Sequence, residues 1–97
     1  MSVNLEQRYQ KSPSIVSRKV AGEMILVPIR SNVGDLESIY TLNDTGASAW
    51  ELFDGQRSLG QVCEAIAAEY EVELEQAQRD LLELAEQLVS VQALEEV

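Results

Sequence analysis

Residues 40–55 mark the change from strands to helices, and they read YTLNDTGASAWELFDG. Asn43, or Asp44 directly after it, is a suitable N-cap because its side-chain oxygen can accept a hydrogen bond from the first helical turn. An apolar stripe follows at helical spacing: Ala49, Trp50 and Phe53. Asp54-Gly55 then is a typical helix stop. The segment predicts a strand that leads directly into a short helix.

Three short strands are predicted before and up to this helix. Residues 15–20 and 23–29 are rich in β-branched and apolar residues, and Ala21-Gly22 between them is typical of a hairpin turn. Residues 38–42 form the third strand. Residues 1–14 are polar and show no pattern, so we expect them to be a flexible lead-in to the domain.

Two more helices are predicted in the second half of the chain. Ser58 and Gln61 make a capping box for a helix that continues to Tyr70, and a longer helix runs from about residue 74 to 89. This order predicts a single α+β domain over residues 15–97, with a small three-stranded antiparallel sheet followed by three helices. The same order describes a winged helix-turn-helix.

The charge is strongly negative and unevenly distributed. The 97 residues include 17 acidic and 7 basic side chains and no histidine, for a formal net charge of -10. Residues 44–97 hold 13 of the acidic residues and only two basic ones, whereas residues 1–43 are nearly neutral. Affinity for nucleic acid depends on Lys and Arg that neutralise phosphates, so this composition argues against such a partner.

The cysteine content and the hydropathy pattern bear on location. Cys63 is the only cysteine, so no internal disulfide can form, which is typical of a reducing compartment. Residues 1–13 contain no apolar run of signal-peptide length, and no window approaches the roughly 18 apolar residues of a membrane span. We expect a cytoplasmic protein that does not contact a membrane.

The residue types offer little chemistry. Without histidine, neither a Cys/His dyad nor a His-based triad can be built, and a Cys/His zinc site lacks ligands. Cys63 lies on an apolar helix face, which favours burial in the core over a redox role. We therefore expect no enzyme activity, no metal site and no cofactor. An enzyme subunit that acts through Cys63 is the weaker alternative.

The third strand is the candidate binding element. If the strands pair in chain order, residues 38–42 form an edge strand, and they contain no Pro, Lys or other charged residue that would protect the edge. An unused edge is the simplest interpretation, and addition of a peptide strand is the alternative. The last helix has an apolar arc wider than one packing contact requires. Its surplus edge would form the groove wall: Gln78, Leu82 and Val89.

At this point the sequence resembles a known family. Residues 40–55, followed by Ser58-Leu59 and the helix through Tyr70, closely resemble the PqqD family, which includes the small protein of pyrroloquinoline quinone biosynthesis and related RiPP recognition elements. The resemblance covers about residues 15–94. It implies a winged helix-turn-helix-like domain without chemistry of its own, which binds the leader segment of a ribosomally made precursor peptide. Such a domain presents the leader to a modifying enzyme, which for the quinone is a radical S-adenosylmethionine protein.

The resemblance also implies where the leader binds. It adds as a strand against the third strand of the sheet and lies in a groove beside the third helix. Carried onto this chain, the peptide-binding residues are Ile39, Tyr40, Thr41, Leu42, Gln78, Leu82, Ala85 and Val89. The signature residues themselves are expected to cap, pack and end the first helix rather than to contact the peptide.

Two further possibilities remain open at this point. The helix order permits a winged-helix DNA-binding regulator, although its recognition helix would offer Arg79 against four acidic residues. The open strand edge also permits a homodimer. In that case a second copy and the peptide would compete for the same edge.

Overall fold

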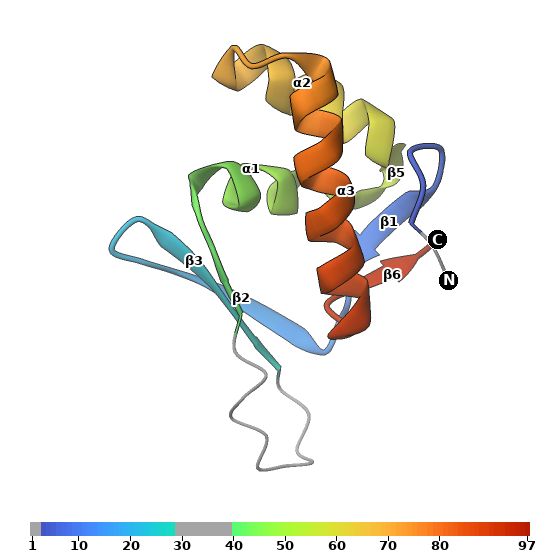
Figure 1. The fold of residues 1–97 in the computed structure, drawn as a ribbon. Helices are drawn as coiled ribbons and strands as arrows, with labels where there is room; N and C mark the ends of the chain where they lie inside the picture. The colour runs from blue at the N-terminus through green and yellow to red at the C-terminus, as the bar shows by residue number, and fades with distance from the viewer. Residues whose placement is uncertain (1–2, 29–39) are drawn as a thin grey trace.

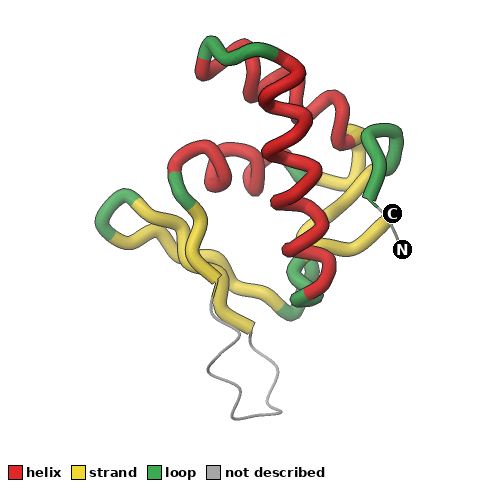
Figure 2. The backbone as a smooth tube through the Cα atoms, viewed as in Figure 1, coloured by secondary structure: helices red, strands yellow, loops and turns green. Residues whose placement is uncertain are grey.

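The computed structural model describes residues 3–28 and 40–97. Three helices pack together, and the strands group into two small sheets (Figures 1 and 2). In chain order the elements are β1 (Arg8–Lys11), β2 (Ile15–Val20), β3 (Glu23–Pro28), β4 (Tyr40–Leu42), α1 (Asp44–Leu52), β5 (Asp54–Ser58), α2 (Leu59–Tyr70), α3 (Leu74–Ser90) and β6 (Leu94–Glu96). The predicted α+β class, with a three-stranded antiparallel sheet and three helices, is confirmed.

The predicted sheet is an antiparallel meander with the order β2-β3-β4. Leu26 pairs with Tyr40 and Met24 with Leu42, so these four side chains share one face of the sheet. Met24, Leu26 and Leu42 on this face are buried. β4 is an edge strand, as the sequence predicts, while Ser38 and Ile39 of the predicted strand lie outside the described residues.

The β2–β3 hairpin closes on the two residues predicted for its turn. Ala21 and Gly22 have φ angles of 52° and 85°, the left-handed values that a two-residue turn of this type requires. Gly22 adopts such a conformation without steric cost because it has no Cβ. The hairpin extends away from the helices (Figure 1), and from Val16 to Val20 the side chains of β2 are exposed.

A second sheet, with the order β5-β1-β6, was not predicted. β1 lies within the expected flexible lead-in of residues 1–14, and its Tyr9 is completely buried, so that expectation is wrong for Arg8–Lys11. β1 pairs with β5, which follows α1, and with β6 at the other end of the chain. These strands are short and largely polar, so they lack the alternation from which a strand can be recognised.

The helices begin where the capping residues predict. The Asn43 side chain accepts a hydrogen bond from the Gly46 N–H at 2.8 Å and starts α1. Ser58 and Gln61 form the reciprocal capping box of α2. The predicted core positions of Trp50 and Cys63 are confirmed, since their exposed fractions are 1% and 0%.

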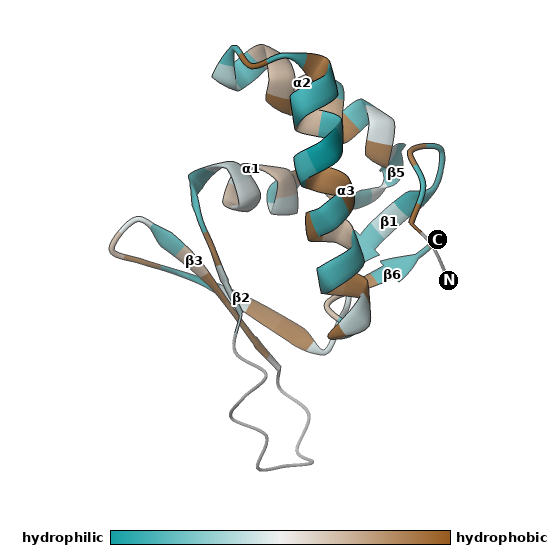
Figure 3. Ribbon diagram, viewed as in Figure 1, coloured by the Kyte–Doolittle hydropathy of each residue, from teal (hydrophilic) through white to brown (hydrophobic). Residues whose placement is uncertain are grey.

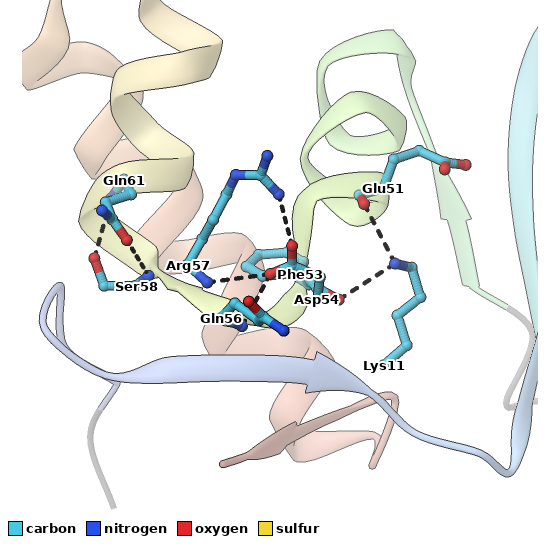
Figure 4. Close-up of polar contacts among 8 residues, drawn as sticks. All are labelled: Lys11, Glu51, Phe53, Asp54, Gln56, Arg57, Ser58 and Gln61. Carbon is cyan, nitrogen blue, oxygen red and sulfur yellow. Dashed lines mark hydrogen bonds and ion pairs between the residues drawn. The ribbon is translucent and has the colours of Figure 1, made fainter.

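One polar cluster joins the second sheet to α1 (Figure 4). Lys11 from β1 donates to the carbonyl oxygens of Glu51 and Phe53, at 3.4 Å and 3.2 Å, where α1 ends. Just beyond, the Asp54 carboxylate accepts hydrogen bonds from two backbone N–H groups of β5 and forms an ion pair with the Arg57 side chain at 2.7 Å. These contacts fix the path of the chain from α1 into β5.

Candidate groove between β4 and α3

A pocket of about 330 Å³ lies between the end of β4, the start of α1 and the middle of α3. Its size is at the lower end of the range for ligand pockets, which suits one or two side chains of a peptide. The lining residues are Tyr40, Thr41, Leu42, Asn43, Thr45, Gly46, Asp80, Leu81, Glu83 and Leu84.

One wall of the groove is the strand β4. Within the described residues β4 pairs with β3 alone, so its other edge presents unpaired backbone groups. Leu42 is buried at the base of this wall, Tyr40 is half-buried, and Thr41 is exposed on the opposite face of the sheet. The structure thus places the predicted residues Tyr40, Thr41 and Leu42 at one pocket, and Ile39 lies outside the described residues.

The opposite wall is formed by α3. Asp80, Leu81, Glu83 and Leu84 face the pocket from two successive turns. One turn beyond Leu84, the Gln87 side-chain oxygen accepts a hydrogen bond from the Tyr40 hydroxyl. This contact joins the two walls at one end of the groove.

The α3 residues predicted for the groove do not line the pocket. Ala85 is completely buried in the core, and Leu82 and Val89 are half-buried against the core. Gln78 lies on the same side of the helix as these residues. These four residues therefore lie outside the lining of this pocket, and their contact with a peptide stays a prediction.

The wide apolar arc of α3 has a packing explanation. The helix contacts α2, β6 and α1, so it buries side chains against three elements at once. Ala77, Leu81, Ala85 and Leu88 form the centre of the buried stripe, and Leu82 and Leu84 lie on its two flanks. Four residues outside the predicted set recur at helical spacing along the flank that faces β4: Asp80, Glu83, Leu84 and Gln87.

Two other kinds of centre can be checked in the described part of the chain, a reactive thiol and a metal cluster. Burial, and secondarily the neighbouring Glu64 carboxylate, raise the pKa of the Cys63 thiol to about 11, so it is protonated at neutral pH. Within residues 3–28 and 40–97, no three His, Cys, Asp or Glu side chains are grouped to hold a metal ion. In the same ranges, no helix has the length and apolar character needed to cross a membrane.

The chain is similar to known proteins in sequence and in fold. The family described as Coenzyme PQQ synthesis protein D (PqqD) matches residues 23–94. A solved structure, TbiB1 in complex with the TbiA(beta) leader peptide, is similar with a TM-score of 0.72 and 24% identity, over 89% of this chain and 94% of that one. No curated protein matches the chain in sequence. Since the family match spans three strands of the fold, all three helices and the groove between β4 and α3, the chain belongs to the PqqD family.

Proposed function

We propose that this protein binds the leader segment of a ribosomally made precursor peptide by strand addition to β4, and presents it to a modifying enzyme. The observation that carries the proposal is the unpaired edge of β4 beside a pocket lined by α3. An extended peptide that pairs with a sheet edge gains main-chain hydrogen bonds, and alternate side chains then enter adjacent pockets.

The two edges of the sheet differ in a way that supports this choice. The outer strand β2 contains Arg18 and Lys19, both exposed, and charged residues of this kind discourage pairing with another strand. The described strand β4 contains neither a charged residue nor a proline. An added strand is therefore accepted more readily beside β4 than beside β2.

The family and the structural neighbour point in the same direction. TbiB1, which shares the fold, was solved with a leader peptide bound. We extend that role to this chain, which acts in the cytoplasm and does no chemistry itself. By analogy with quinone biosynthesis, its partner enzyme is a radical S-adenosylmethionine protein, and the precursor is encoded near its gene.

A titration by NMR tests the binding mode. The precursor peptide encoded beside the gene is added to the isotope-labelled full chain, and backbone amide shifts are mapped. We expect the largest shifts at Tyr40–Leu42 and at residues 80–87 of α3. Shifts confined to β1, β5 and β6 would contradict the proposal.

A matched pair of leucine variants sharpens the test. Leu84 lines the pocket, whereas Leu82 lies on the other flank of the same helix, and both are half-buried. Leu84→Ala should weaken peptide binding roughly 5- to 30-fold, because a buried leucine contact is worth about 1–2 kcal/mol. Leu82→Ala should leave the affinity within about twofold. Equal losses would mean that the groove lies elsewhere.

The same edge is open to a second copy of the chain. We propose that any homodimer pairs through β4 and dissociates when the peptide binds. Sedimentation with and without saturating peptide measures this directly. A dimer that persists at saturation would show that peptide and partner copy use different surfaces.

Binding to DNA is disfavoured by the charge of α3. The helix carries Arg79 against Glu75, Asp80, Glu83 and Glu86, and all five are exposed. Like charge repels the phosphate backbone, whose neutralisation supplies most of the affinity of DNA-binding proteins. A salt-dependent gel shift with the purified chain would be needed to support a regulator instead.

A further inference from the structure

We infer that the groove selects a peptide segment that contains a large apolar residue and a Lys or Arg two positions before or after it. This inference rests on the proposed function and names the peptide chemistry that this particular groove accepts. It depends on the two kinds of residue that line the α3 wall.

The base of the groove is apolar. Leu42 and Leu81 are each 2% exposed, and Leu84 is half-buried beside them. Gly46 keeps the backbone of α1 close to this base, because a Cβ there would lie 3.2 Å from the Asn43 side-chain oxygen and 3.4 Å from the Leu42 side chain. A side chain that enters the pocket therefore meets hydrocarbon, which favours an apolar anchor.

The helical side of the pocket carries two carboxylates. Asp80 and Glu83 are the charged residues of the lining, and both are exposed. The Gln76 amide donates to both oxygens of Asp80 at 3.1 Å, which orients this carboxylate without neutralising it. Within the described ranges, no Lys or Arg forms an ion pair with either residue. Both carboxylates are thus available to a cation brought in by a ligand.

The spacing follows from strand geometry. Side chains two residues apart in a strand point to the same side, about 6.8 Å from each other. Asp80 and Leu84 are one helical turn apart on α3, a rise of about 6 Å along its axis. When one peptide side chain fills the pocket, the next one on the same side is therefore within reach of a carboxylate. The long, flexible stems of Lys and Arg suit this position.

The direct test uses a library, because it requires no knowledge of the natural precursor. A random library of 12-residue displayed peptides is selected on the immobilised full chain. We expect enrichment of a large apolar residue with Lys or Arg two positions away. The selected peptides are then synthesised, and their binding sites are mapped by the amide shifts of Tyr40–Leu42.

Charge variants on the same helix provide the control. Asp80→Asn with Glu83→Gln removes the two pocket carboxylates, whereas Glu75→Gln with Glu86→Gln removes two acidic residues outside the lining. The first pair should weaken binding of the selected peptides roughly three- to tenfold and flatten the salt dependence. The second pair should change the affinity by less than about twofold.

The outcomes separate this inference from the proposed function. In one outcome, the selected peptides shift the amide resonances of β4 and yet show no enrichment of Lys or Arg; in another, they bind both double variants with equal affinity. Either result would overturn the inference and leave leader binding intact. If no selected peptide shifts the amides of β4, both are overturned.

Discussion

Cys63 shows at the scale of one residue how burial decides reactivity. Its side chain is completely buried on the inner face of α2, and desolvation raises the pKa of its thiol from 9.0 to about 11. The thiolate is the reactive form, so a shift of this size lowers its population at pH 8 about a hundredfold. An enzyme role through this residue would need the opposite shift.

We predict that Cys63 reacts with Ellman's reagent at pH 8 at least about a hundredfold more slowly in the folded chain than in the denatured chain. Below the unfolded pKa of about 9 the protonated thiol is present in both states, so its stabilising contribution is complete. As the pH rises through about 11, this contribution is lost. Denaturation of the wild type and of Cys63→Ala from pH 7 to 11 should give curves that converge at high pH. Parallel curves would contradict the raised pKa.

At the scale of a secondary-structure element, Lys11 stabilises the carboxyl end of helix α1. α1 has no basic residue in its last turn, and Lys11 from β1 supplies the cation at its C-terminus. Its Nζ also lies 5.8 Å from the centroid of the Trp50 ring, within range of a cation–π contact. A cation near the carboxyl end of a helix opposes the partial negative charge of the free carbonyl groups.

We predict that Lys11→Met destabilises the fold by about 1 kcal/mol, because the apolar stem is kept and only the cation is removed. Thermal denaturation should show a melting temperature about 4–8 °C lower. Lys19→Met is the matched control, since Lys19 is exposed on β2 and the change in charge is the same. Equal effects of the two variants would show that Lys11 does not act through α1.

At the scale of the whole molecule, the two ends of the chain are part of one sheet. Tyr9 near the N-terminus pairs with Glu96, and the Val97 N–H donates to the Arg8 carbonyl. Leu94 is only 2% exposed although it lies three residues from the C-terminus. Tyr9 of β1 and Leu94 of β6 both belong to the buried core, so this sheet contributes to it.

We predict that Leu94→Ala destabilises the protein by about 3 kcal/mol, because it opens a cavity in the core. Val97→Ala is the control, since Val97 is 61% exposed and its loss should cost less than about 0.5 kcal/mol. Urea denaturation of both variants measures the difference. A small effect of Leu94→Ala would mean that β6 contributes little to the core.

The candidate site shows where sequence reasoning reaches its limit. The edge character of β4 is predictable, because a run without charge or proline is a local property of residues 40–42. The α3 wall is not. A helical wheel shows that the apolar arc of α3 is wide, but it has two flanks, marked by Leu82 and Leu84, and nothing local distinguishes them. The packing of α3 against α2, α1 and β6 turns the Leu84 flank toward β4.

The amino-acid sequence by itself determined the elements whose signals are local. These include the turn at Ala21-Gly22, the caps at Asn43 and Ser58, and the acidity of the helices. Only the tertiary structure decided that Arg8–Lys11 is a strand and which flank of α3 faces the groove. Both depend on partners distant in sequence, and a short polar strand or a two-sided helix is specified by what packs against it rather than by its own periodicity.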